Sequence, residues 1–261
     1  MKKNTDLSIK LIHGDCITEM QKLINDDVKV DLILTDPPYG TTSCRWDNII
    51  PFKPMWECIN KLTNDKTPII LFSSQPFTSE IVHSKIKWFK HEWIYQKKNG
   101  TNFASYKYAP AKVHENILVF CKKSPNYYPI KEPKAESSIK REKYGNKGTE
   151  THEYNGLKTL AYEGGSRDVL KYPISVRKIN NLNPKNRGLH PSQKPVELLE
   201  YLIKTYSKED ELVLDFTMGS GSTGVACQNT NRNFIGIELE KEYFDVAVKR
   251  LNNNNEQSKL I

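Results

Sequence analysis

Short apolar runs alternate with segments of helical periodicity through the first 120 residues. One β-branched, apolar run at 28–34 stops at Asp36-Pro37-Pro38, which breaks regular structure. Runs at 69–72, 93–95 and 117–120 are also typical of strands. Helical spacing precedes and follows the first run, as shown by Ile17, Met20, Leu23 and Ile24, and then by Met55, Ile59 and Leu62. Strands that alternate with helices predict a mostly parallel sheet covered on both faces.

The pattern is clearest after residue 190. Ser192 can cap a helix that has Pro195 in its first turn and an apolar face extending to Tyr206. A buried strand at 212–215 runs into a Gly/Ser turn at 216–224, which opens a second helix. The next strand covers 234–238, and a last helix contains Phe244 and Leu251. The sequence therefore predicts a complete βαβα unit, and the predicted fold class is α/β.

The middle of the chain, 122–189, follows neither pattern. It contains five prolines and six tyrosines, the latter interleaved with lysines and arginines, and few sustained apolar stretches. We interpret it as an irregular insertion between the two halves of one α/β domain, 1–121 and 190–261. We expect the insertion to be partly mobile when no ligand is bound.

The net charge of +8 is concentrated in this middle part. Residues 1–120 carry 16 basic and 13 acidic side chains, a balance of +3. Residues 121–194 carry 16 and 7, a balance of +9, and residues 195–261 carry 7 and 11, a balance of −4. A basic segment in an otherwise balanced protein suggests a polyanion partner, although a solvated, lysine-rich surface explains the charge equally well.

Composition disfavours a membrane-spanning protein, a secreted protein and a small protein held together by zinc or disulfides. The 261 residues, 37% hydrophobic and 27% charged, can bury a substantial core. No apolar run approaches the roughly 18 residues of a membrane span, and the N-terminus lacks the apolar stretch of a signal peptide. The five cysteines are scattered without a Cys-x-x-Cys pair, which disfavours a zinc ribbon and a disulfide framework. We therefore expect reduced thiols and a cytoplasmic protein.

A glycine-rich turn follows the strand at 212–215. Its sequence, Gly219-Ser220-Gly221-Ser222-Thr223-Gly224, matches G-x-G-x-x-G, and Glu238 ends the next strand 19 residues after Gly219. Such glycines let a ligand approach the backbone and the acid can hold ribose hydroxyls, which indicates a cofactor that contains adenosine. A purely structural glycine turn is the alternative. Asp215, at the strand end, would repel a pyrophosphate but suits the ammonium of S-adenosylmethionine.

The tetrapeptide Asp36-Pro37-Pro38-Tyr39 stands at the end of a predicted strand. The exocyclic amine of adenine is a poor nucleophile because its lone pair is delocalised into the ring. Asp36 and the Pro37 carbonyl can accept hydrogen bonds from that amine, and Tyr39 can stack on a base that has left the duplex. A plain turn is the alternative for a bare Asp-Pro-Pro. Its place after a buried strand, in a chain with a cofactor loop, favours the chemical role.

Together, the two motifs resemble those of the amino-methyltransferases of DNA. The order, with the catalytic motif first and the cofactor loop last, resembles their permuted β group, and the resemblance runs through most of the chain. It implies a Rossmann-like, class I S-adenosylmethionine-dependent methyltransferase sheet with a target-recognition region inserted at 122–189. The segments that also match are His13–Cys16, Trp46-Asp47, Trp93 with Lys97, His114-Glu115, and His190–Pro195, which is close to His-Pro-Thr-Gln-Lys-Pro. One departure is Asp215-Phe216-Thr217, where many members read Asp-Pro-Phe.

The motifs and the resemblance together assign roles to residues, with no metal ligand among them. The expected catalytic residues are Asp36, Pro37, Pro38 and Tyr39. The expected cofactor-binding residues are Asp15, Cys16, Asp36, Ser192, Gln193, Lys194, Asp215, Phe216, Gly219, Ser220, Gly221, Ser222 and Glu238. A helix N-terminus that carries Lys194 is a natural site for the cofactor carboxylate. The expected DNA contacts are Arg45, Lys97, Lys98, Arg141, Lys143, Tyr144, Arg167, Arg177 and Lys178.

The resemblance implies an enzyme that methylates the N6 amine of adenine in double-stranded DNA, because this motif begins with Asp in adenine members and usually with Ser in cytosine members. Methylation of cytosine N4 is the alternative within the family. Two functions of other classes are alternatives. An NAD-dependent oxidoreductase could use the same glycine-rich turn, but that function would not explain Asp36–Tyr39. A catalytically inactive DNA-binding protein is disfavoured because the Asp-Pro-Pro-Tyr motif is intact. Many relatives are dimers, which implies a homodimer here, and a cognate restriction endonuclease remains open as a partner.

Overall fold

The structure is a computed structural model of the chain, and it describes residues 8–42, 44, 47–101, 107–133, 153–154, 157–158, 170–171, 173–179 and 193–258. The chain divides into two compact units. The larger contains residues 1–128 and 175–261, and the smaller contains residues 129–174. In the described part of the chain, no helix is long and apolar enough to cross a membrane.

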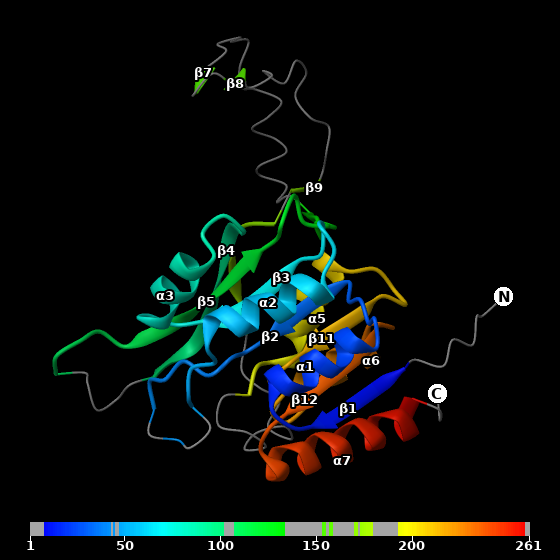
Figure 1. The fold of residues 1–261 in the computed structure, drawn as a ribbon. Coiled ribbons are helices and arrows are strands. Elements are labelled where there is room, and N and C mark those ends of the chain that lie inside the picture. The colour runs from blue at the N-terminus through cyan, green and yellow to red at the C-terminus, as the bar shows by residue number, and fades with distance from the viewer. Residues whose placement is uncertain are drawn as a thin grey trace. The chain divides into compact units, whose positions relative to one another are not determined.

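Eight strands form the sheet of the larger unit: β1 (Ile9–His13), β2 (Leu32–Thr35), β3 (Ile69–Ser73), β4 (Phe89–Thr101), β5 (Lys112–Phe120), β10 (Val176–Lys178), β11 (Leu212–Asp215) and β12 (Asn233–Glu238). Their order is β1-β12-β11-β2-β3-β5-β4-β10 (Figure 1). The first five run parallel, β5 is antiparallel to both of its neighbours, and β10 is parallel to β4. The predicted α/β class with a mostly parallel sheet is confirmed.

Within the described residues, six helices cover the two faces of this sheet (Figure 1): α1 (Cys16–Asn25), α2 (Phe52–Leu62), α3 (Phe77–Ser84), α5 (Val196–Tyr206), α6 (Ser222–Asn229) and α7 (Lys241–Ser258). Successive side chains of a strand point to opposite faces, so each buried strand serves two cores. In β2, Leu32 and Leu34 pack with α5, α6 and α7, whereas Ile33 packs with α1, α2 and α3. This double burial explains why the central strands are continuous apolar runs.

The sequence pattern does not predict β1, β10 or α3. β1 is an edge strand with mixed burial, and β10 has only three residues, of which two are exposed. The helix expected to begin after Ser192 begins later, since α5 starts at Val196. Its N-cap residue is Pro195, which forms no side-chain capping hydrogen bond. Ser192 itself lies outside the described residues.

The smaller unit contains two antiparallel pairs of very short strands. β6 (Glu132–Pro133) pairs with β9 (Leu170–Lys171), and β7 (Glu153–Tyr154) pairs with β8 (Leu157–Lys158). This unit, 129–174, lies inside the predicted insertion, whereas β10, also within 122–189, belongs to the large sheet. The boundaries of a target-recognition region, and its mobility, stay predictions.

Candidate active site

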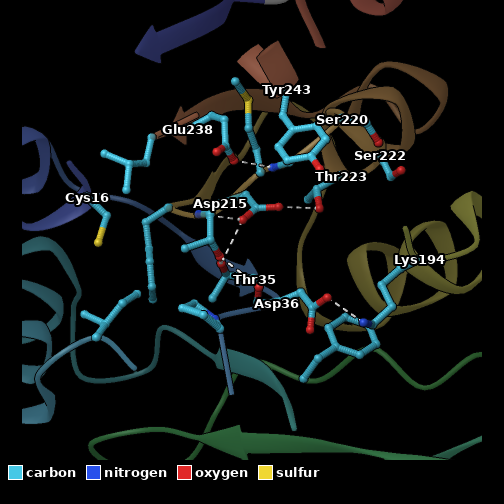
Figure 2. A pocket seen from close by; sticks show the side chains of 18 of the residues that line it. Cys16, Thr35, Asp36, Lys194, Asp215, Ser220, Ser222, Thr223, Glu238 and Tyr243 are labelled. Carbon is cyan, nitrogen blue, oxygen red and sulfur yellow. Dashed lines mark hydrogen bonds and ion pairs between the residues drawn. The ribbon is translucent and has the colours of Figure 1, made fainter. Parts of the chain in front are cut away.

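A cavity of about 310 Å³ lies where several parallel strands end (Figure 2). Its wall contains the residues that follow β1, β2 and β11 and the end of β12, because parallel strands present their carboxyl ends at one edge of a sheet. The volume falls in the range of roughly 300–1,000 Å³ typical of small-molecule sites. The described residues of the wall include one lysine, Lys194, and four carboxylates, which belong to Asp15, Asp36, Asp215 and Glu238. The cavity is therefore suited to a cationic ligand.

The glycine-rich turn is tied to Glu238 by hydrogen bonds. The Gly219 N–H donates to Oε2 of Glu238 at 2.8 Å, and the Glu240 N–H donates to Oε1 at 2.8 Å. Burial raises the pKa of Glu238, against the lowering effect of these bonds. Each oxygen still has a second lone pair, which leaves Glu238 able to accept from a ligand.

Gly221 is constrained by the turn and by the packing of α7. It has a positive φ of 76°, and it is not part of the cavity wall. A Cβ built on Gly221 would lie 3.1 Å from the Cβ of Ala247 in α7. The turn and the close packing of α7 therefore both require a glycine here, and its predicted role at the cofactor stays a prediction.

Asp215 is held by three donors. Its Oδ1 accepts from the Thr35 hydroxyl at 2.7 Å and from the Thr217 N–H at 3.1 Å, and its Oδ2 accepts from the Thr223 hydroxyl at 2.6 Å (Figure 2). Burial raises the pKa of Asp215 to about 6, although these hydrogen bonds oppose the shift. The carboxylate lines the cavity at the position expected for an ammonium partner, but neutral donors of the chain already fix its orientation.

Both carboxylate oxygens of Asp36 have partners. The Lys194 ammonium lies 2.5 Å from Oδ2, and the Tyr39 hydroxyl donates to Oδ1 at 2.5 Å. The Tyr39 ring packs on Phe77, with the centroids 5.3 Å apart. Burial raises the pKa of Asp36, and the positive charge of Lys194 opposes this effect. Of the two prolines, Pro37 is buried and Pro38 lines the cavity.

Lys194 points to carboxylates of the protein itself. Besides Asp36, its ammonium lies 3.3 Å from Oε2 of Glu115, whose other oxygen forms an ion pair with Lys97. Both lysines are thus paired with carboxylates of the protein, and the expected roles of Lys194 at the cofactor and of Lys97 at DNA stay predictions. The adjacent Gln193 lines the cavity, and both polar atoms of its amide are buried without a hydrogen-bond partner among the described residues.

Two residues to which the sequence assigns no role support these motifs. Asp47 accepts the backbone N–H groups of Tyr39 and the next three residues, at 2.6–2.9 Å. Arg250 of α7 donates to the Ser222 hydroxyl at 2.9 Å and to the Ser220 carbonyl at 3.2 Å, behind the glycine-rich turn. The Trp46-Asp47 segment is visible as a motif, but neither set of contacts has a signal in the sequence.

Comparison with known proteins decides the family. Residues 30–249, most of the chain, match the profile of the N6/N4 methyltransferase family, described as DNA methylase. The chain belongs to this family of DNA methylases. The predicted family and enzyme class are thereby confirmed, as is DNA as the substrate.

Several relatives of this methylase align over nearly the whole chain. The type II methyltransferase M.HinfI of Haemophilus influenzae is 29% identical over 96% of this chain and 70% of its own length. M1.MboII of Moraxella bovis is 28% identical, over 92% and 96%. The crystal structure of the M1.HpyAVI–SAM complex is 27% identical with a TM-score of 0.66, covering 94% of this chain and 99% of its own. The cytosine-N4-specific PvuII methyltransferase, 14% identical with a TM-score of 0.62 and covering 96% of this chain and 92% of its own, shares the fold.

The other expected site residues of the methylase have varied surroundings. Asp15 caps α1 by accepting from the N–H and the hydroxyl of Thr18, both at 2.9 Å. Cys16 also lines the cavity, and burial raises its pKa to about 12, so it stays a neutral thiol. Phe216, Ser220 and Ser222 lie in the cavity wall as well.

The expected DNA contacts are only partly described. Lys98 and Lys178 are exposed, and the Arg177 guanidinium lies 3.9 Å from the centroid of the Tyr201 ring. Arg45, Arg141, Lys143, Tyr144 and Arg167 lie outside the described residues. Among the residues that the structure covers, no group of three His, Cys, Asp or Glu could hold a metal ion.

Proposed function

We propose that this DNA methylase transfers a methyl group from S-adenosylmethionine to the exocyclic N6 amine of an adenine flipped out of double-stranded DNA. The observation that carries the proposal is the placement of Asp36, from Asp-Pro-Pro-Tyr, in the wall of a cavity rich in carboxylates. The family acts on exocyclic amines, and Asp36 can meet such an amine while a cationic methyl donor occupies the same cavity.

The residues of the cavity fit S-adenosylmethionine. Four carboxylates against one lysine favour a ligand with an ammonium and a sulfonium over a dinucleotide, whose pyrophosphate is anionic. The unpaired amide of Gln193 offers a donor and an acceptor to a ligand, and Glu238 can accept from ribose hydroxyls. M1.HpyAVI, 27% identical over most of both chains, was solved with SAM, which supports the same cofactor here.

Asp36 would act on the nucleophile. The amine can donate one N–H to Asp36 and the other to the Pro37 carbonyl, which turns its lone pair out of conjugation with the ring. S-adenosylmethionine supplies a methyl group whose leaving group is a neutral thioether, so the reaction needs no metal. The nitrogen gains positive charge as its new C–N bond forms, and the carboxylate stabilises that charge. The raised pKa of Asp36 then suits it to receive the proton that the nitrogen loses.

The finer parts of the proposal concern the target and the partners. Asp at the start of the motif favours adenine over cytosine N4, which the same family includes. We infer that the insertion at 122–189, with most of the excess positive charge, reads the DNA sequence. The relatives carry the name type II methyltransferase, which supports a cognate restriction endonuclease as a partner. A homodimer would cover a longer site than one short recognition region.

Sequencing of DNA from cells that express the protein tests the function, with Asp36→Asn and the exposed-acid control Asp65→Asn alongside. We expect N6-methyladenine in one sequence context with the wild type and with Asp65→Asn, and none with Asp36→Asn. N4-methylcytosine would replace the adenine assignment, and unmodified DNA would contradict the proposal.

A variant that lacks 130–172 tests the insertion separately, because this deletion spares Tyr128, which donates its N–H to the Thr205 carbonyl, and β10 of the large sheet. We expect S-adenosylmethionine binding to persist in calorimetry while sequence-specific methylation is lost. Methylation of the same sequence by this variant would place recognition elsewhere in the chain.

A further inference from the structure

Four side chains of alternating charge form a row beside the cavity. Lys97 pairs with Glu115, Glu115 lies 3.3 Å from the Lys194 ammonium, and Lys194 lies 2.5 Å from Asp36. All four are shielded from solvent, with side-chain exposures between 8% for Lys194 and 24% for Lys97. Glu115 and Lys97 are not part of the cavity wall, so Asp36 and Lys194 are the two members of the row that can meet a ligand there.

The present hydrogen bonds of Asp36 weaken it as an acceptor for the amine of the target base. An ammonium 2.5 Å from Oδ2 neutralises the carboxylate and lowers its power to accept a hydrogen bond from a weakly acidic amine. The Tyr39 hydroxyl occupies Oδ1 at the same distance. Each oxygen keeps a lone pair for the amine, but the full negative charge of the carboxylate is available to it only when the ammonium moves away.

Glu115 provides a place for the Lys194 ammonium to go. Its Oε2 is buried and has no hydrogen-bond partner among the described residues, although it lies only 3.3 Å from that nitrogen. Rotation of the Lys194 stem toward Glu115 would shorten this contact to the 2.7–2.9 Å of a charge-assisted hydrogen bond and lengthen the contact to Asp36. Lysine suits such a movement, because its ammonium is a point charge on a flexible stem with three donors.

We propose that Glu115 is a positioning residue that draws the Lys194 ammonium off Asp36 as the target base enters, so that Asp36 can accept the N–H of the amine. This inference rests on the proposed function. The ammonium keeps a counter-ion throughout, and the Asp36 carboxylate, now less closely paired, accepts the amine N–H more strongly while positive charge develops on the amine nitrogen. Glu115 thus acts through Lys194 and does not touch the substrate.

A double-mutant cycle separates this role from a structural one. The variants are Glu115→Gln, Lys194→Met and the double variant, with Glu92→Gln as the control. Glu92 lies on the neighbouring strand β4, where its carboxylate accepts from the Asn116 amide at 2.8 Å, outside the row. The measurements are the single-turnover methylation rate at saturating DNA and S-adenosylmethionine, the affinity for S-adenosylmethionine, and the unfolding temperature.

We expect Glu115→Gln to lower the single-turnover rate at least about tenfold, as for the loss of one charge-assisted hydrogen bond, with unchanged cofactor affinity. In the Lys194→Met background the same change should have little further effect, since no ammonium remains to be moved. Lys194→Gln replaces Lys194→Met if the latter lowers the unfolding temperature. An unaltered rate in Glu115→Gln, or equal losses in both backgrounds, would overturn the inference. A wild-type protein that methylates no DNA would overturn the proposed function instead.

Discussion

Asp47 organises the segment that carries Tyr39, and its removal should weaken both the fold and catalysis. Its Oδ1 accepts from the N–H groups of Tyr39 and Gly40 at 2.8 and 2.9 Å, and its Oδ2 accepts from those of Thr41 and Thr42 at 2.9 and 2.6 Å. Asp47 itself is only 5% exposed. One side chain therefore fixes four consecutive residues directly after Pro37 and Pro38.

The expected loss follows from these four bonds. A hydrogen bond to a charged group contributes about 1.5–3 kcal/mol to stability. Loss of four such bonds would cost at least about 6 kcal/mol if no water bound the released N–H groups. The backbone of Gly40, Thr41 and Thr42 belongs to exposed residues, so water can replace roughly half of this. We expect Asp47→Ala to lower the free energy of unfolding by about 3 kcal/mol. Asp47→Asn, which keeps one acceptor oxygen, should lose about half as much.

The contribution of Asp47 to the free energy of unfolding should disappear at acidic pH. Burial by itself would raise its pKa, but the hydrogen bonds from Thr42, Gly40 and Tyr39 lower it below the usual 3.8. A carboxyl group whose pKa is depressed in the folded state stabilises that state above the unfolded pKa and loses this contribution as the pH falls through the folded value. The difference between wild type and Asp47→Ala should therefore be constant above about pH 5 and shrink below pH 4.

Urea unfolding at several pH values measures the difference, and methylation assays measure its consequence. The Tyr39 hydroxyl reaches Asp36 from the segment that Asp47 holds, so the methylation rate should fall in the order wild type, Asp47→Asn, Asp47→Ala. Asp65→Asn, which removes an exposed carboxylate paired with Lys123, is the control and should match the wild type in both assays. Wild-type stability and turnover in Asp47→Ala would refute the reasoning.

Three further predictions concern the charge of Asp215, the packing of the glycine-rich turn and the independence of the reaction from metal ions. Asp215 has a pKa of about 6 in the folded protein against an ordinary 3.8, so its ionisation costs about 3 kcal/mol, a penalty that grows as the pH rises above about 4 and is complete above about 6. A cationic ligand would offset that penalty, so calorimetry should show S-adenosylmethionine affinity rising from pH 5 to 7 in the wild type but not in Asp215→Asn. Gly221→Ala should lower the unfolding temperature, because the new Cβ would be strained at a φ of 76° and crowd Ala247; an unchanged temperature would argue against this packing role. Excess EDTA should leave methylation intact, and rescue of an EDTA-inhibited enzyme by a divalent cation would contradict the metal-free reaction.

The strands that the sequence predicts are mainly those that are buried on both faces of the sheet. Four strands in the interior of the sheet, β2, β3, β11 and β12, are nearly completely buried. Each of them is therefore recognisable in the sequence as an apolar run. β1 alternates between partly buried and exposed residues at the sheet edge, so no comparable signal exists. The antiparallel direction of β5 also escapes prediction, because the spacing of apolar residues carries no information on strand direction.

The site was predictable where its residues are neighbours in sequence. Asp36–Tyr39 and the turn from Gly219 are continuous motifs, and the family match confirms the class of enzyme to which they point. Lys194 shows the limit of local reasoning. Its position near a helix N-terminus suggests an anion ligand, but only the folded chain shows that the anions are Asp36, 158 residues away, and Glu115. Long-range pairs of this kind leave no trace in a single sequence.

Three aspartates of this site show how surroundings divide one side chain into separate roles. Asp47 receives four fixed backbone donors that lower its pKa, so it is a permanent anion that organises the chain around it. Asp215 receives neutral donors that cannot outweigh burial, which leaves it poised to respond to a cation in the cavity. Asp36 alone is paired with a cation whose second partner, Glu115, lies within reach. Because that cation can move toward Glu115 and keep a counter-ion, Asp36 is the carboxylate whose charge can become more available when an amine binds.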